Sequence, residues 1–178
     1  MPDYSEFDAL LSQMTAAAAE VRLSNEVVPR LVELWLGEYG RTTDSGEIVE
    51  TTVDSFTYLF DIQAERLIAA WGISRGRTVR TRDASRIAGH PRSSDERYHR
   101  GHAIAHTLGG GTDINLVPQL ASVNIGPFRQ LEREALKAPG ALYFTYWSYN
   151  DPHTQQPTAV DQGLFIAGRL PQIRRHAN

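Results

Sequence analysis

The segment 100–119, with the sequence RGHAIAHTLGGGTDINLVPQ, constrains the fold of this chain more than any other stretch. It holds two histidines, three consecutive glycines, an asparagine and a Pro-Gln pair within 20 positions. Glycine adopts backbone conformations that other residues avoid, so Gly109–Gly111 predict a tight turn of the chain. A hydrophobic core does not require this density of polar groups, and the segment is therefore the first candidate for a functional site.

Chain length and composition limit what can surround this segment. A length of 178 residues allows one domain, or one domain with an appended helical segment. The absence of cysteine excludes disulfides and thiolate metal sites. The first residues, MPDYSEFDALL, carry acids where a secretory signal would carry Lys or Arg, and no apolar run is long enough to span a membrane. We expect no membrane partner, and any export or delivery into other cells would use a route without a signal peptide.

Charge is unevenly distributed along the chain. Residues 1–65 carry 13 acidic and 3 basic residues, whereas residues 66–102 carry 9 arginines and 3 acidic residues. A basic segment of this kind favours a polyanionic partner such as nucleic acid. An arginine-rich surface that pairs with the acidic N-terminal part explains the same distribution, so charge alone leaves both interpretations open.

Two helices are predicted in the N-terminal part. Apolar residues recur at helical spacing over 5–21, where Ser5 is the expected N-cap. The same spacing recurs over 25–39, with Asn25 as the expected N-cap and Pro29 tolerable near the helix start.

A polar stretch at 40–47, GRTTDSGE, is the best candidate for a boundary. It divides the chain into a helical N-terminal segment, 1–50, and a second unit, 51–178. The stretches 48–60 and 64–73 that follow have the pattern of strands, or of a strand and a short helix, and the sequence does not separate these alternatives.

Farther along the chain the patterns are clearer. A helix is predicted over 126–137, with Pro127 in its first turn. Strands are predicted over 141–149 and 158–168, joined by a Pro-containing loop. Glu132 falls on the apolar side of the predicted helix, and a carboxylate on an inward face needs a partner or a task. The apolar side of this helix consists of Phe128, Leu131, Ala135 and Leu136.

Four polar residues follow one another in the order strand, loop, helix: His102, Asn115, Asn124 and Glu132. This order, with its spacings, resembles the DNA/RNA non-specific endonuclease family of His-Me finger (ββα-metal) nucleases, including its bacterial toxin-type members. The family pattern is Asp-Arg-Gly-His, a Gly-rich turn, Asn-x-x-Pro-Gln, an Asn nine positions past the first, and a Glu eight positions further. The matching residues are His99-Arg100-Gly101-His102, Gly109–Gly111, Asn115 with Pro118-Gln119, Asn124 and Glu132.

The resemblance implies an α+β fold with a ββα-metal core, antiparallel strands and a helical N-terminal segment. It also implies metal-dependent hydrolysis of phosphodiester bonds in DNA, and in RNA as a second substrate, with little sequence specificity and with 5′-phosphate ends. The tyrosine-rich stretch and Pro loop after the motif helix are similar to those of toxin-type members. That similarity implies an effector delivered to competitor bacteria, with a dedicated immunity protein as its partner.

The resemblance assigns a role to each matching residue. His102 is the expected general base, because a neutral imidazole can take a proton from water near pH 7. Asn124 is the expected direct ligand of Mg²⁺, or of another divalent cation such as Mn²⁺, and Glu132 accepts from a metal-bound water. The other expected members of the catalytic set are Arg100, Asn115 and Arg80.

Two departures from the family pattern affect these assignments. His99 stands where the family has Asp, so the structural bond of that Asp is not assigned here. The phosphate-side arginine upstream of the motif has several candidates, of which Arg80 is the first choice. The candidates are Arg77, Arg80, Arg82 and Arg86.

Each residue also has a structural explanation. His106 alternates with apolar positions and is predicted to be structural. Asn115 is equally a candidate for an Asx turn, Asn124 for a helix cap, and Glu132 for a pair with Arg129 across one helical turn. Five elements in order with two matching spacings are hard to obtain by chance, so we prefer the nuclease. The alternatives are a catalytically silent module that binds nucleic acid or a partner, and a helical adaptor.

Overall fold

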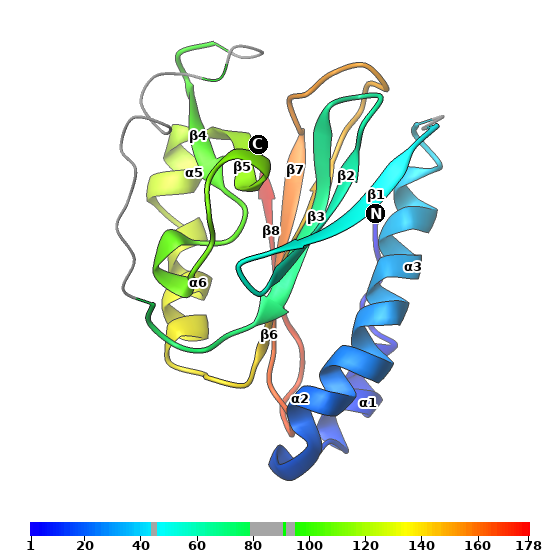
Figure 1. The fold of residues 1–178 in the computed structure, drawn as a ribbon, viewed down its shortest axis with the longest axis vertical. Helices are drawn as coiled ribbons and strands as arrows, with labels where there is room; N and C mark the ends of the chain where they lie inside the picture. The colour runs from blue at the N-terminus through cyan, green and yellow to red at the C-terminus, as the bar shows by residue number, and fades with distance from the viewer. Residues whose placement is uncertain (44–45, 79–90, 92–94) are drawn as a thin grey trace.

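A six-stranded antiparallel sheet forms the centre of the fold in the computed structural model, which describes residues 1–43, 46–78, 91 and 95–178 (Figure 1). Neighbouring strands follow the order β1-β2-β3-β6-β7-β8. The strands are β1 (Ile48–Val53), β2 (Phe56–Asp61), β3 (Arg66–Ile73), β6 (Leu142–Ser148), β7 (Ala159–Phe165) and β8 (Gln172–Ala177). The stretch 48–60 therefore holds β1 and most of β2, joined by a turn at Asp54 and Ser55, and the stretch 64–73 holds β3. The short helix that the sequence left open does not form in these two stretches.

Strand β6 explains why the sheet has a layer on each face. Its residues 142–147 are all buried, as expected of a strand covered on both sides. Phe144 and Tyr146 pack against Trp35 of the N-terminal helices, whereas Trp147 packs against Phe128 on the opposite face. Alternate side chains of one strand thus fill two apolar layers that belong to one hydrophobic core.

The N-terminal layer contains α1 (Phe7–Ser12), α2 (Ala19–Arg22) and α3 (Val28–Tyr39), with a π-helical stretch, Leu23–Val27, between the last two. The predicted helix over 5–21 is wrong in its continuity, because α1 ends at Ser12. Both predicted N-caps are also wrong: the cap of α1 is Glu6, without a side-chain hydrogen bond, and Asn25 lies inside a continuous helical stretch.

A buried stripe gives the physical reason for the second difference. Leu23, Val27, Leu31 and Trp35 recur every four residues and are fully buried, so the helix passes through Asn25 without a break. Pro29 lies in the first turn of α3, as predicted.

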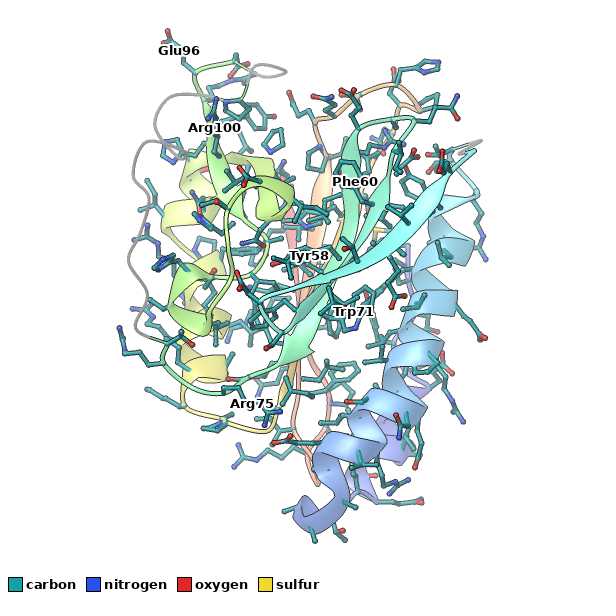
Figure 2. The ribbon with its side chains drawn as sticks, viewed as in Figure 1. Tyr58, Phe60, Trp71, Arg75, Glu96 and Arg100 are labelled. Carbon is teal, nitrogen blue, oxygen red and sulfur yellow. The ribbon has the colours of Figure 1, made fainter. Side chains whose placement is uncertain are left out.

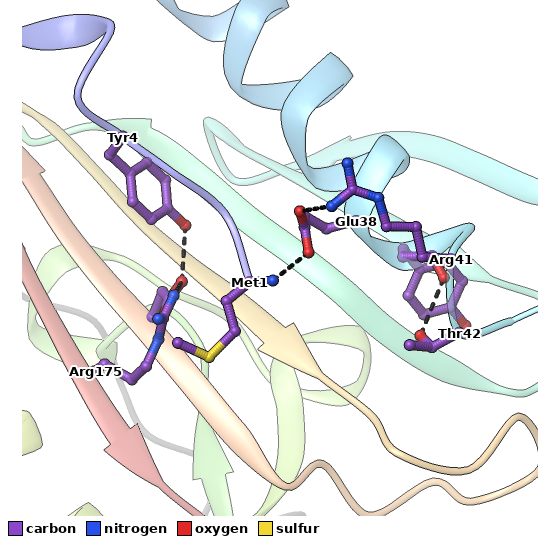
Figure 3. Close-up of polar contacts among 8 residues, drawn as sticks. Met1, Tyr4, Glu38, Arg41, Thr42 and Arg175 are labelled. Atoms are coloured by element: carbon purple, nitrogen blue, oxygen red, sulfur yellow. Dashed lines mark hydrogen bonds and ion pairs between the residues drawn. The ribbon is translucent and has the colours of Figure 1, made fainter.

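Polar contacts hold this layer to the sheet (Figure 3). The hydroxyl of Tyr4 donates to Oδ2 of Asp161 on β7 at 3.1 Å, and the guanidinium of Arg175 on β8 binds the same carboxylate. The division of the chain at residue 50 stays a prediction. The described residues on both sides of it contribute to the same hydrophobic core.

The opposite face carries the ββα unit that the sequence led us to expect. It consists of β4 (Tyr98–His102), β5 (Leu116–Leu120), α5 (Ala121–Ile125) and α6 (Phe128–Leu136), and β4 pairs with β5 in a separate two-stranded sheet. The α+β fold class, the helix predicted over 126–137 and the strands predicted over 141–149 and 158–168 are confirmed. Strand β8 was not predicted. Among the described residues, no helix has the length and apolar character needed to cross a bilayer.

Candidate active site

A cavity of about 370 Å³ lies between the β4 end of the ββα unit and helix α6. Three residues predicted from the sequence line it: His102, Asn124 and Glu132. They come from β4, α5 and α6 respectively, so the fold brings together side chains that span 30 positions of the sequence. Five further polar residues line the same cavity: Arg77, His106, Thr107, Arg129 and Arg133.

His102 is the last residue of β4 and lies opposite Leu116 of β5. The pairing of the two strands continues for one more bond, because the backbone N–H of Ala103 donates to the carbonyl of Asn115 at 2.9 Å. His102 is partly buried. The hairpin therefore fixes the backbone that presents this imidazole to the cavity.

Asn115 holds the chain directly after His102. Its Oδ1 accepts from the N–H of Ile104 at 2.7 Å, and its Nδ2 donates to the carbonyls of Ile104 and Gly111 at 2.8 and 2.9 Å. The side chain is fully buried and does not line the cavity. Asn115 thus fixes the loop that connects β4 to β5, which is consistent with a supporting part in the site.

Close backbone approach explains one of the three consecutive glycines. A Cβ at Gly110 would lie 2.0 Å from the carbonyl oxygen of Ile104 and 2.8 Å from Nδ2 of Asn115. Gly109 has a φ of 107°, in the left-handed region that favours glycine. The glycines therefore allow the loop to fold tightly against the Asn115 amide, as the sequence suggested.

Glu132 faces inward from α6, as predicted. Burial raises the pKa of its carboxyl to about 7, and this effect exceeds the opposing influence of the positive charges of Arg129 and Arg133. No hydrogen bond or ion pair to Glu132 occurs within the described part of the chain, so the expected alternative of a pair with Arg129 is not observed. A partly buried carboxyl at the wall of a cavity, with no partner among the residues that the structure describes, is suited to a cation.

Asn124 lies inside α5 and supplies the second oxygen donor. The N-cap of α6 is Pro127, and no side-chain hydrogen bond caps that helix, so Asn124 does not serve as its cap. Amide and carboxylate oxygens are the ligand types that Mg²⁺ and Mn²⁺ prefer. Among the described residues no group of three or more His, Asp or Glu could hold an ion. Asn124 and Glu132 therefore fit a cation that keeps several of its waters.

The arginines of the predicted site are placed differently. Arg100 lines a separate cavity of about 260 Å³, together with Phe60 and Pro118. Figure 2 labels Arg100 and Phe60. Arg80, the first choice for the phosphate-side arginine, lies outside the described residues, as do Arg82 and Arg86. Arg77, the remaining candidate, is exposed and lines the cavity that contains His102.

Three ionisable residues of this cavity were not assigned to the site from the sequence. His106 was predicted to be structural, yet it lines the cavity from the 3₁₀ turn His106–Leu108. Arg129 and Arg133 are exposed at the cavity wall, one turn before Glu132 and directly after it. Helical spacing from Glu132 could have identified Arg129 as a neighbour of the site, because residues three apart share a helix face.

Comparisons with known proteins bear on the family and the fold of this chain. A search of curated proteins finds no match. The crystal structure of NucA from Streptococcus agalactiae with no metal bound is similar to this chain, with a TM-score of 0.51 and 17% identity over 90% of this chain and 92% of that chain. The crystal structure of NucA from Streptococcus agalactiae with magnesium ion bound gives a TM-score of 0.49 and 16% identity, over 75% and 85% of the two chains. The first of these similarities shows a shared fold.

The model of the DNA/RNA non-specific endonuclease family matches residues 44–142. This range includes the whole ββα unit and covers more than half of the chain. The chain belongs to the DNA/RNA non-specific endonuclease family.

Proposed function

We propose that this nuclease is a metal-dependent endonuclease that hydrolyses phosphodiester bonds of DNA, and of RNA as a second substrate, with little sequence specificity. One observation carries the proposal: His102, Asn124 and Glu132 line a single cavity although they lie on three different elements. A base and two oxygen donors in one cavity are the groups that this hydrolysis needs.

His102 is the group that we propose to activate water. Its neutral imidazole accepts a proton from the attacking water, and a positioned base of this kind accelerates hydrolysis by about 10²–10⁴-fold. The pairing of β4 with β5 and the hydrogen bonds of the Asn115 amide hold the backbone around His102 in place, so the base needs little reorganisation.

Asn124 and Glu132 are the residues that would hold the divalent cation, Mg²⁺ or Mn²⁺. When bound, such a cation neutralises negative charge on the phosphate and on the leaving oxygen. Asn124 contributes a neutral amide oxygen. Glu132 would contribute a carboxylate, and the positive charge of the ion would offset the cost of burying that negative charge.

Arg77, Arg129 and Arg133 supply the positive charge at the cavity wall. Guanidinium groups bind phosphate oxygens through forked hydrogen bonds and offset the charge on the non-bridging oxygens. Contacts to the phosphate backbone carry no sequence information, which supports low sequence specificity.

The experiment that tests the proposal uses supercoiled plasmid DNA with Mg²⁺, with Mn²⁺ and with EDTA. We expect nicked and linear products with either cation and none in EDTA. Asn124→Ala should abolish metal-stimulated cleavage with nearly unchanged thermal stability, and Glu132→Gln should reduce it by a smaller factor of about 10–100. Asn25→Ala, on the exposed surface of the N-terminal layer, is the matched control. DNA binding without cleavage under any of these conditions would favour a catalytically silent module instead.

The proposal extends to a biological role as an antibacterial effector with a dedicated immunity protein. Support comes from the tyrosine-rich strand and the Pro-containing loop after the motif helix, which resemble those of toxin-type members. Controlled expression inside bacterial cells tests this role. Wild type should stop growth and Asn124→Ala should not, whereas normal growth with active nuclease present would contradict it.

A further inference from the structure

A second cavity, of about 260 Å³, lies where the large sheet meets the β4–β5 hairpin, and we call it the Arg100 cavity. Phe60 of β2 lines it from the sheet, whereas Arg100 and Pro118, which are opposite each other in the hairpin, line it from the hairpin. Figure 2 shows Phe60 and Arg100 at the same end of the molecule. None of these three residues lines the cavity that contains His102, so the Arg100 cavity is a separate site.

The buried side chain of Arg66 holds one wall of the Arg100 cavity in place. Its guanidinium donates to the carbonyls of Asp151 and Thr154, in the loop between β6 and β7, at 2.8 and 2.7 Å. The same guanidinium lies 4.2 Å from the centre of the Tyr149 ring, and Tyr149 also lines the cavity. This wall is therefore formed before any ligand arrives, which lowers the entropic cost of binding.

The charges of the Arg100 cavity differ from those of the cavity that contains His102. The charge of Arg66 is already bound by protein carbonyls, and the other charged residues are Arg100, Glu65 and Asp113. The cavity with His102 instead has three arginines and one carboxylate. Carboxylates repel a phosphate group, so the Arg100 cavity is better suited to an uncharged ligand that carries hydrogen-bonding groups.

Apolar surface makes up another part of the Arg100 cavity. Phe60, Leu116 and Pro118 line it and are only partly buried. The amide of Gln155 lies at the same cavity, where its Nε2 donates to Oε2 of Glu65 at 3.1 Å. A nucleobase has matching chemistry, because its faces are flat and apolar and its edge carries donors and acceptors. Aromatic side chains stack on any base, so such a site is compatible with low sequence specificity.

The hairpin connects the Arg100 cavity to the proposed base of the reaction. Arg100 precedes His102 by two residues on β4, which corresponds to about 7 Å along a strand. Leu116, the residue opposite His102 in the hairpin, lines the Arg100 cavity. The two cavities are therefore close enough to be reached by neighbouring nucleotides of one nucleic-acid strand.

We propose that the Arg100 cavity binds the base of an unpaired nucleotide next to the phosphate that is cleaved at His102. This inference rests on the proposed function, because it names the form of nucleic acid that the nuclease engages. A base must leave the stack to enter a cavity, so the ligand is a single strand or a locally opened duplex. Arg100 then contacts the base, and the arginines of the other cavity contact the phosphate.

Binding to two single strands of equal length tests the inference, one of thymidine nucleotides and one without bases. Fluorescence anisotropy in EDTA measures both affinities without cleavage. We expect wild type to bind the thymidine strand about tenfold more tightly than the abasic strand. Phe60→Leu removes the ring but keeps an apolar side chain, and it should lose most of this difference. Phe60→Tyr keeps the ring and is the matched control, which should retain the difference.

Arg100→Gln tests the hairpin side of the cavity and replaces Phe60→Leu if that variant does not fold. It should weaken binding of the thymidine strand more than binding of the abasic strand. The slope of log affinity against log salt should stay unchanged, because loss of a phosphate contact reduces that slope by about one and loss of a base contact does not.

Equal affinity of wild type for the two strands would overturn the inference, and so would equal binding of the thymidine strand by Phe60→Leu and Phe60→Tyr. A reduction of the salt slope by about one in Arg100→Gln would overturn it as well, because Arg100 would then contact phosphate. These results concern binding without metal. Failure of the proposed function appears elsewhere, as wild-type protein that cleaves no plasmid DNA with either cation.

Discussion

At the scale of single residues, Glu132 shows most clearly how the fold changes the chemistry of a side chain. Its carboxyl titrates near 4.5 in the unfolded chain, and burial raises the pKa to about 7 in the folded protein. Protonated Glu132 therefore favours folding. This contribution is fully present below about pH 4.5 and is lost as the pH rises through about 7.

The substitution Glu132→Gln tests this loss of stability at high pH, because glutamine is neutral at every pH. Without metal, the variant and wild type should be equally stable at pH 4, where both side chains are neutral. At pH 8 the variant should be more stable, by a free energy of unfolding on the order of 1–3 kcal/mol. Urea denaturation in EDTA measures both values. Glu134→Gln, at a half-buried ion pair with Arg174, is the control and should not gain stability at pH 8. Equal stability of Glu132→Gln and wild type at pH 8 would contradict the account.

At the scale of elements, the loop between β4 and β5 depends on close backbone packing at one glycine. Gly110→Ala places a methyl group against the carbonyl oxygen of Ile104, which should destabilise the protein by about 1–3 kcal/mol or more. It should also lower kcat, because the displaced backbone is the one that follows His102. Gly111→Ala is the matched control, since its Cβ would meet only Oδ2 of Asp54, at 3.3 Å. Equal melting temperatures and rates for the two variants would show that this close approach is unimportant.

The elements that the sequence predicts well are those with a strong local pattern. The helix over 126–137 has an apolar side and a proline at its start, and both features act within the helix itself. The break after Ser12 and the absence of a cap at Asn25 depend on packing against the sheet, which local periodicity does not contain. Strand β8 contains two arginines and a histidine, and its pairing with β7 gives it strand structure.

At the scale of the whole molecule, the sheet separates the N-terminal helices from the ββα unit (Figure 1). The acidic N-terminal helices therefore lie on the opposite face from the arginines at the cavity wall. We expect DNA affinity to fall steeply with added salt, because bound phosphates release counterions. Arg129→Gln and Arg133→Gln should each reduce the slope of log affinity against log salt by about one.

Arg30→Gln, on the exposed surface of α3, is the control that should leave the salt slope unchanged. Fluorescence anisotropy in EDTA, at several salt concentrations, measures the slope without cleavage of the DNA. An equal effect of Arg30→Gln would mean that the basic cavity wall does not direct binding.

The sequence also predicted part of the site at this scale. His102, Asn124 and Glu132 converge because they lie in one continuous ββα unit, whose spacings are visible in the sequence. Arg100 lines another cavity although it is only two positions from His102 on the same strand. A linear pattern gives the order of residues but does not give the cavity that each side chain lines.

The most direct test of the central claim compares His102→Ala with His106→Ala, two histidines that line the same cavity. An unprotonated His102 is needed as the base, so wild-type cleavage should decline as the pH falls below about 6.5, the ordinary pKa of histidine. His102→Ala should bind DNA and Mn²⁺ as wild type does but lose most of its turnover, by about 10²–10⁴-fold in kcat. His106→Ala should lower the melting temperature more than the rate. The reverse pattern, with His102→Ala active and His106→Ala inactive, would contradict the assignment of the base and the motif alignment on which it depends.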